Sequence, residues 1–558
     1  MEDGGELSLE EKLARDPAWF NHPPVQKFLR SIPVIILVGS LFLLYGYFLA
    51  HKIDLVTADI GRHIKNGEIL LQDASVLERN FYSYTNPDFP VINHHWGSGL
   101  LFYLFWKYAG FTGVQLFFIF LSFAAFLAFL KTARRYAPWG VVGLVALPAI
   151  FLLGERTEIR PEVFSYLFAG IFFYILCRFR ESSLSSLPPL NPPERLFSRA
   201  GRGEGKGGDS LLWLLPIIQV LWVNTHIYFL LGPLILGAFL LEALVIQRER
   251  FLKLFWIFAA TLAATLINPF GYRAIAGALT LFQNFGYRLA ENQSVWFLER
   301  LGMTNPNFLI FKILLGVLGL SFLMALYRHW RGTRLAHVFI AAGISTLAFL
   351  ASRNLTLFGL FLVPLLAANV QTAFGSRLPE RPLRTAATVF AAAALFISII
   401  FTTPRSFPYW RTFGLGLEQG NSAAAEFLKR ENIRGPIFNN YDIGGYLIFH
   451  LFPSEKVFVD NRPEAYPADF FQKVYIPLQE DESVWKEALA EYNFNAIIFS
   501  HRDATPWGQR FLVKRVRDRD WAPVFVDGRV AVFVRRTDEN RTLIERSELP
   551  RDVFRISQ

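Results

Sequence analysis

The chain has 558 residues and a formal net charge of +10, and apolar residue types make up 53% of it. Its 57 Phe, 13 Trp and positive mean hydropathy exclude an ordinary soluble protein, because such a chain would have to hide these residues in several cores. The basic residues stand at the ends of apolar runs, where topology signals lie, and this argues against nucleic acid as a partner. The single cysteine, Cys177, excludes both a disulfide framework and a cysteine metal site.

Apolar runs long enough to cross roughly 30 Å of hydrocarbon recur along the chain. Residues 1–32 are predicted to be a cytoplasmic segment, and the first run, 33–50, is a retained span because it lacks a small-residue cleavage site. Two stretches in the external loop 51–112 are predicted to be interfacial helices, 60–72 and 97–109. The eleven predicted spans lie at 33–50, 113–130, 139–154, 163–179, 211–223, 227–246, 252–267, 307–326, 335–351, 355–374 and 385–401.

The basic clusters between the spans predict the topology. With the N-terminus in the cytoplasm, every inside loop carries a group of Arg or Lys. The outside turn 224–226 carries neither, and the outside turn 351–354 carries a single Arg. This alternation predicts a multi-pass protein of the inner (plasma) membrane with an extracytoplasmic C-terminal domain. The inside loop 181–210 is rich in Ser, Pro and Gly and is predicted to be a flexible linker.

From residue 402 the pattern changes from spans to short helical and β-rich stretches. This predicts a transmembrane domain over 33–401 and a small extracytoplasmic α/β domain over 402–558. The expected helices of the second domain are 423–430, 482–491 and 507–516, and its expected strands are 436–438, 457–459, 496–499, 523–526 and 530–534.

Ionisable side chains at the outer edge of the membrane are energetically costly and are therefore candidates for function. Asp59 precedes the first interfacial helix, where it could act as a general base or simply cap the helix. His94 and His95 stand at the start of the second one and suit a metal ion, a phosphate or proton transfer; alternatively they anchor the interface with Trp96.

A dense group of charges follows the third span. Glu155, Arg156, Glu158 and Arg160 lie within six residues, before Pro161. The planar guanidinium of arginine matches phosphate, so the group is predicted to bind an anionic substrate; the alternative is a salt-bridge network that caps two helices.

Two outside turns and one long loop add further candidates. His226, in the turn Asn224-Thr225-His226, and Arg353, in the turn 351–354, are either ligands of a lipid phosphate or caps of helical hairpins. The external loop 268–306, which contains Glu291, is long enough to form a lid or the wall of a cleft, although no single residue in it stands out.

Three segments resemble, in their order, motifs of the GT-C superfamily of membrane glycosyltransferases, especially the protein O-mannosyltransferase and lipid A aminoarabinose transferase types. Asp59 and the helix up to Gly67 look like the first acidic segment, NHHWGSGLLFYLFWKYAG looks like the H/K-P-P-L…G segment, and RTEIRPEVFSYLF stands in the place of the second acidic motif. The acidic pair of the superfamily is Asp59-Ile60 here, and the second acid would be Glu155 or Glu158. The chain is also similar to uncharacterised bacterial multi-pass proteins over Trp222–His226, Asn268–Gly271, Ser352–Asn354, Asn439–Leu447 and Asp460–Arg462.

The resemblance implies a GT-C-like α-helical polytopic membrane enzyme. It would transfer a hexose or pentose from a polyprenyl-phosphate carrier to a lipid, glycan or protein acceptor on the outer face. Asp59 would deprotonate the acceptor, and Arg160 and Arg353 would hold the carrier phosphate. The other implied site residues are His94 and His95, which would assist or hold a divalent metal ion, Glu158 in the catalytic set, and Arg156 and His226 in the substrate-binding set.

Two other classes of function stay open. A lipid or solute transporter would have internal repeats and charges at mid-membrane depth. A non-catalytic scaffold or sensor would account for the missing second carboxylate. A site at the outer leaflet where Asp59 converges with an arginine favours an enzyme, whereas a cavity that reaches the cytoplasm favours transport.

Overall fold

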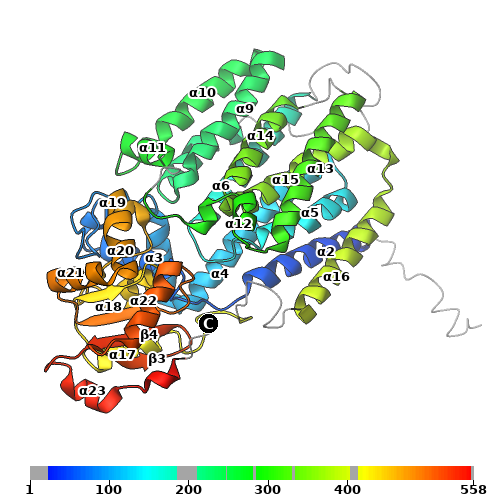
Figure 1. Ribbon diagram of the computed structural model, residues 1–558. Helices are drawn as coiled ribbons and strands as arrows, with labels where there is room; N and C mark the ends of the chain where they lie inside the picture. The colour runs from blue at the N-terminus through cyan, green and yellow to red at the C-terminus, as the bar shows by residue number, and fades with distance from the viewer. Residues whose placement is uncertain are drawn as a thin grey trace, which may run out of the picture.

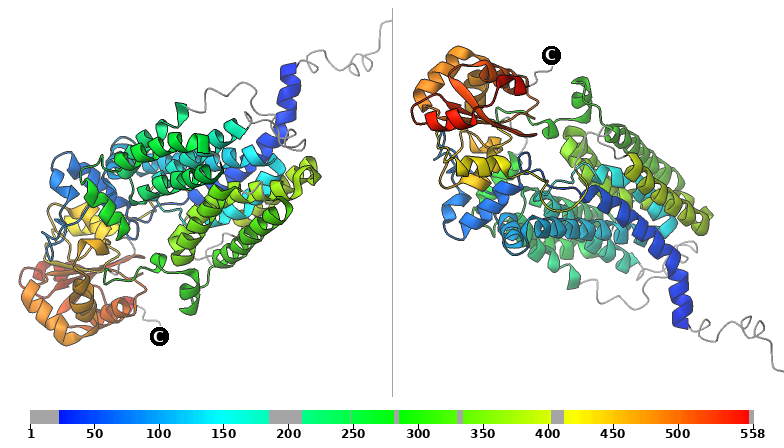
Figure 2. Two further views of the ribbon diagram at one scale, coloured as in Figure 1. Left: turned by 90° about the horizontal axis from the view of Figure 1, so that it is seen from above. Right: turned by 90° about the horizontal axis from the view of Figure 1, so that it is seen from below.

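The computed structural model describes residues 23–184, 210–246, 248–280, 285–329, 334–401 and 412–554 (Figure 1). Most of the predicted cytoplasmic segment 1–32 and nearly all of the predicted linker 181–210 lie outside these residues. The described chain folds into a bundle of helices and a smaller C-terminal unit that contains one sheet. Figure 2 shows that unit at one end of the bundle, whereas the first helix begins at the other end.

Each of the eleven predicted spans falls on a helix, so the helical membrane-protein fold expected from the sequence is confirmed. Within the described residues, seven helices are long and apolar enough to cross a membrane, and three shorter apolar helices accompany them. The predicted spans fall on these ten helices and on α10 (Arg248–Ala264). The ten are α2 Pro23–Leu49, α4 Trp96–Tyr136, α5 Trp139–Leu153, α6 Glu162–Leu184, α8 Leu214–Val223, α9 Leu231–Ile246, α13 Pro306–His329, α14 Leu335–Leu350, α15 Leu355–Phe374 and α16 Glu380–Phe401.

Helix α4 consists of two segments that meet at Gly110. The backbone of Gly110 has φ 62° and ψ −164°, a conformation that favours glycine because a Cβ would clash with the backbone. The stretch 97–109 is therefore a helical segment separate from the span that follows it, as predicted.

Helix α3 (Ile60–Leu70) corresponds to the other predicted interfacial helix. It packs against the first segment of α4 on one side and against α18 (Gly444–Leu451) of the C-terminal unit on the other. A Cβ atom on Gly67 would lie 2.3 Å from the carbonyl oxygen of Gly99, so the absence of a side chain lets α3 and α4 approach closely. The polar residues Arg62 and His63 of α3 are consequently buried.

The C-terminal unit is an α/β domain with a four-stranded sheet in the order β1-β2-β4-β3. Strand β1 (Ile437–Asn439) pairs in parallel with β2 (Ala496–Ser500), while β4 (Val530–Arg535) runs antiparallel to both β2 and β3 (Trp521–Val526). Its remaining principal helices are α17 Ala423–Arg430, α21 Glu482–Tyr492, α22 Pro506–Arg517 and α23 Arg541–Ser547.

One predicted strand of this domain, 457–459, is wrong. Val457 makes only an isolated bridge to Ser83, in the loop between α3 and α4. The amide of Val457 donates to the Tyr82 carbonyl at 3.1 Å, and that of Tyr84 donates to the Val457 carbonyl at 3.1 Å. The β-rich run therefore ties the C-terminal domain to the first external loop and does not extend the sheet.

Candidate active site

Asp59 stands directly before α3, and its side chain does not cap that helix. Its Oδ2 atom lies 3.1 Å from Nη1 of Arg160, and the side-chain amide of Asn461 donates a hydrogen bond to Oδ1. Burial raises the pKa of the Asp59 carboxyl, while the positive charges of Arg160 and Arg62 act to lower it. The helix-cap alternative is therefore wrong, and Asp59 is a half-buried, ion-paired acid.

The turn between α5 and α6 presents the charges that bind Asp59. Pro161 favours an extended backbone at Arg160, so side chains two residues apart point to the same side. Ile159 is buried in the apolar core, whereas Arg160 donates to Oε2 of Glu158 through Nη2 at 2.8 Å and through Nε at 3.0 Å. Because side chains alternate in direction along residues 158–160, Glu158 and Arg160 lie on the same side and form an ion pair with two hydrogen bonds.

Glu291, from the loop 268–306, is a residue to which the sequence assigned no role. Its carboxylate lies 2.6 Å from Nη1 of Arg156, 3.4 Å from Nη1 of Arg160 and 3.7 Å from Nη1 of Arg353. Burial alone would raise the pKa of Glu291, but these three guanidinium groups lower it to about 2. The sequence pointed to Glu291 only indirectly, because three arginines in predicted outside turns need carboxylate partners.

Arg353 is held within the same group of charges. Its Nη2 atom lies 3.1 Å from Oε1 of Glu162, and Nη1 donates to Oδ1 of Asn292 at 3.0 Å. Arg156 also pairs with Glu162, at 2.5 Å. Four segments of the chain therefore converge in one charge cluster, which consists of Asp59, Arg62, Arg156, Glu158, Arg160, Glu162, Glu291 and Arg353.

Glu155, the other candidate for the second acid, points elsewhere. Its carboxylate accepts from the side-chain amides of Asn305, at 3.1 Å, and of Asn307, at the start of α13. Of the two candidates for the second acid, Glu158 is therefore the one that lies in the cluster, where it shares Arg160 with Asp59.

A row of three imidazoles lies beside the charge cluster. The ring centroid of His95 is 5.5 Å from that of His63 and 5.1 Å from that of His226. Nδ1 of His226 is 2.7 Å from the hydroxyl of Ser165. Burial lowers the pKa of all three rings, to about 3 for His226, so they are neutral near pH 7.

His94, the neighbour of His95, lies apart from this row. Its ring packs near Phe270, and a Cβ on Gly277 of α11 (Tyr272–Leu279) would lie 2.6 Å from its Nε2 atom. Burial lowers the pKa of His94 to about 4. The structure therefore brings His95 and His226 close to arginines of the charge cluster, but places His94 under α11.

The C-terminal domain covers the charge cluster through Asn461. Nε of Arg62 donates to Oδ1 of Asn461 at 3.1 Å, while the Nδ2 group of Asn461 donates to Asp59. Gly61 allows α3 to approach α18, since a Cβ on Gly61 would lie 3.3 Å from the Gly445 carbonyl oxygen. The glycine pair at 444–445 instead lets α18 pack against residues 459–461, because a Cβ on Gly445 would lie 3.2 Å from Nδ2 of Asn461.

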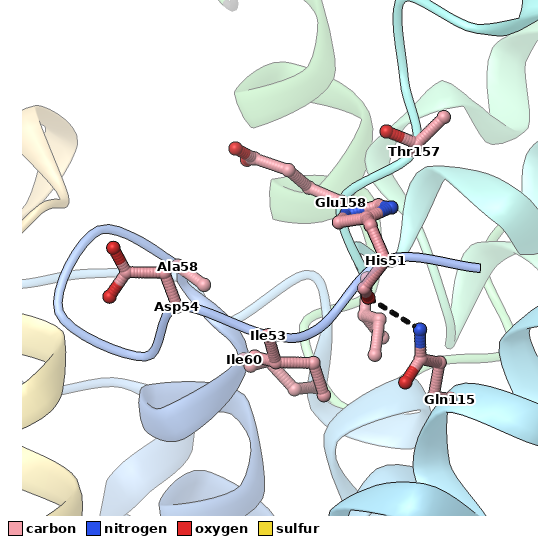
Figure 3. A pocket seen from close by; sticks show the side chains of 9 residues that line it. His51, Ile53, Asp54, Ala58, Ile60, Gln115, Thr157 and Glu158 are labelled. Carbon is pink, nitrogen blue, oxygen red and sulfur yellow. Dashed lines mark hydrogen bonds between the residues drawn. The ribbon is translucent and has the colours of Figure 1, made fainter. Parts of the chain in front are cut away.

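A small cavity adjoins the cluster between the end of α2 and the α5–α6 turn (Figure 3). Gln115 of α4 lies at its base and donates to the carbonyl of His51 at 2.7 Å. Glu158 and Thr157 border it from the turn. The lining residues are His51, Ile53, Asp54, Ala58, Ile60, Gln115, Thr157, Glu158 and Ile159.

The helical bundle with its C-terminal α/β domain is the GT-C-like fold that the sequence resemblance implies. Among solved structures, the chain is similar to the oligosaccharyltransferase of Archaeoglobus fulgidus in complex with Zn and sulfate, with a TM-score of 0.52 and 11% identity over 88% of this chain and 71% of that one. The apo form of the same protein gives a TM-score of 0.52 and 11% identity over 89% and 72%. No protein-family model and no curated protein matches the chain.

The side chains of this site do not fit a resident metal ion. Across the described parts of the chain, no three His, Cys, Asp or Glu side chains are placed to hold one. The three carboxylates that meet at Arg160 are Asp59, Glu158 and Glu291, and each is paired with that guanidinium. At the point where they meet, the three carboxylates therefore surround a fixed positive charge and not an empty position for a metal ion.

Proposed function

We propose that this protein is a membrane glycosyltransferase that moves a sugar from a polyprenyl-phosphate carrier to an acceptor at the extracytoplasmic face. The observation that carries the proposal is the position of Asp59, a half-buried carboxylate that is 3.1 Å from Arg160 and accepts a hydrogen bond from Asn461 of the C-terminal domain. The GT-C-like fold supports it, since the similar solved structures are of an oligosaccharyltransferase.

The proposed reaction is a single displacement at the anomeric carbon of the sugar. A hydroxyl or amine of the acceptor attacks that carbon while the carbon–oxygen bond to the carrier phosphate breaks. The acceptor proton passes to the Asp59 carboxylate, and the bonding electron pair leaves with the polyprenyl phosphate. A single displacement inverts the configuration of the anomeric carbon.

The arginines around Asp59 suit the leaving group. Negative charge grows on the carrier phosphate as the bond breaks, and guanidinium groups stabilise it best where they are held in place beforehand. Arg156, Arg160 and Arg353 are each held by buried or half-buried carboxylates. Arg160 and Arg353 would hold the phosphate, Arg156 would support them, and the neutral ring of His226 would line the sugar side.

The acceptor is proposed to be a lipid, a glycan or a protein, positioned by the C-terminal domain. The transferred group would be a hexose or a pentose. The rival functions, transporter and non-catalytic scaffold, gain no specific support: the small cavity lies beside Asp59, and Asp59 with its paired arginine is arranged as a base would be.

The proposal is tested by mass spectrometry of carrier lipids and envelope glycans in a strain that lacks this protein. We expect one sugar-linked polyprenyl phosphate to accumulate and one glycan to lose the corresponding sugar. Restoration by the wild-type chain and not by Asp59→Asn would link the change to this site. Unchanged carrier lipids and glycans in the deletion strain would contradict the proposal.

A further inference from the structure

The guanidinium group of Arg160 lies at the meeting point of three carboxylates that come from three separate segments. Asp59 Oδ2 is 3.1 Å and Glu291 Oε2 is 3.4 Å from the same nitrogen, Nη1. Glu158 Oε2 is 2.8 Å from the other terminal nitrogen, Nη2. The side chain of Arg160 is only 20% exposed, so water screens these charges weakly.

Without a cation at this point the three carboxylates would repel one another. Carboxylates that share a site ionise together only when a positive charge lies between them. In proteins this charge is often a divalent cation with oxygen ligands. Here the side chain of Arg160 supplies it, and the α5–α6 turn holds that side chain beside Glu158 while Ile159 is buried in the core.

We infer that Arg160 is a tethered cation that takes the position of a divalent metal ion, so that this site works without one. The guanidinium carries a fixed positive charge and up to five N–H donors, and it stays charged at every physiological pH. It can hold Asp59 in place and offer hydrogen bonds to an anion. The catalytic part of this inference rests on the proposed function, whereas the charge arrangement does not.

The inference predicts what removal of Arg160 does. In Arg160→Ala, Asp59 and Glu158 lose their shared cation and become oxygen ligands for a divalent ion, while Glu291 stays paired with Arg156 at 2.6 Å. We expect the full-length protein in lipid nanodiscs to gain one Mn²⁺ per chain, at least about tenfold tighter than any site of the wild type. Electron paramagnetic resonance measures this directly, because the signal of free Mn²⁺ falls as the ion binds.

Matched variants separate this effect from a general loss of positive charge. Arg160→Lys keeps a cation at the same position and should gain no Mn²⁺. Arg434→Ala removes an exposed arginine that pairs with the single carboxylate of Glu455, and it should gain none either. The double variant Arg160→Ala with Glu158→Gln should lose the gained site. Arg160→Gln, which keeps a polar side chain, serves if the alanine variant fails to fold.

Two results would overturn the inference. One is a wild-type protein that binds Mn²⁺ tightly and loses the ion in Glu158→Gln. The other is the failure of both Arg160→Ala and Arg160→Gln to gain a site. Sugar transfer by the wild type should also continue in excess EDTA. Absence of transfer in every sample would contradict the proposed function, while the Mn²⁺ result would still decide the role of Arg160.

Discussion

At the scale of single residues, the orientation of Asp59 depends on a side chain from another domain. Asn461 accepts from Arg62 and donates to Asp59, so its amide is fixed at both ends. A hydrogen bond to the ionised carboxylate favours the charged form, against the burial that disfavours it. Asn461 is therefore a positioning residue for the proposed base.

Replacement of Asn461 should change the pH dependence of transfer more than substrate affinity. Asp59 acts as a base only when ionised, so the rate falls as the pH is lowered through its raised pKa. Asn461→Ala removes a donor to the ionised form and should move this acidic limb to higher pH by about one unit, with kcat at neutral pH reduced about tenfold and KM little changed. The measurement is a pH–rate profile in reconstituted membranes.

A purely structural role for Asn461 would give a different profile. The rate would fall equally at every pH, and the acidic limb would keep its position. Asn86, whose side-chain amide donates to the neighbouring Thr85 hydroxyl, provides the control substitution Asn86→Ala.

The residue types of the site could be predicted from the sequence, but their partners could not. Charges at the ends of spans pointed to Asp59, Arg160 and Arg353, and the structure brings all three together. The role of Glu291 could not be predicted, because no neighbouring residue in its own segment indicates it. Its partners are arginines more than 60 residues away in the chain. Likewise, His94 and His95 look equivalent in sequence, and only the packing of α11 separates them.

At the scale of elements, the close contact between α3 and α4 positions the proposed base, Asp59, which directly precedes α3. Gly67→Ala would place a Cβ 2.3 Å from the Gly99 carbonyl oxygen, a backbone atom that cannot move alone. We expect this change to push α3 away, lower the melting temperature in detergent by several degrees and reduce transfer, at a cost of about 1–3 kcal/mol.

The matched control is Gly39→Ala in α2. A Cβ on Gly39 would meet no atom within 4 Å, and alanine favours a helix over glycine. This variant should melt at or slightly above the wild-type temperature. If both variants melted alike, the close approach of α3 and α4 would not be what positions Asp59.

Helical elements were predictable because long apolar runs and their breaks are local properties of the sequence. Gly110 separated 97–109 from the following span, and the structure has its only break of α4 there. The run 457–459 has the composition of a strand, but its partner, Ser83, lies in the loop between α3 and α4. A pairing over that separation leaves no local signal, so the sequence wrongly predicts a strand of the C-terminal domain there.

At the scale of the whole molecule, the C-terminal domain docks on the segments that form the site. Asp54, after α2, lies 2.9 Å from Nη1 of Arg502 and 3.4 Å from Nε of Arg529. Tyr287, in the long external loop, stacks on Tyr441 with ring centroids 4.4 Å apart. The turns that the charge alternation predicts on one side of the membrane therefore meet at one end of the bundle, together with this domain.

The predicted topology can be measured by cysteine labelling, because the only native cysteine, Cys177, is buried. Lys473→Cys introduces an exposed thiol in the C-terminal domain. A membrane-impermeant maleimide should label it in intact spheroplasts, whereas Glu249→Cys, in the first turn of α10, should react only after lysis. Labelling in the reverse order would place the site on the cytoplasmic face.

The most direct test of the proposed function is sugar transfer by Asp59→Asn in reconstituted membranes. The asparagine keeps the size of the side chain but cannot take up the acceptor proton, and positioned general bases contribute about 10²–10⁴-fold to rates. We expect at least about a hundredfold loss of kcat, with Asp469→Asn, an exposed aspartate paired with Lys473, at the wild-type rate. Transfer by Asp59→Asn at the wild-type rate would contradict the assignment of Asp59 as the base.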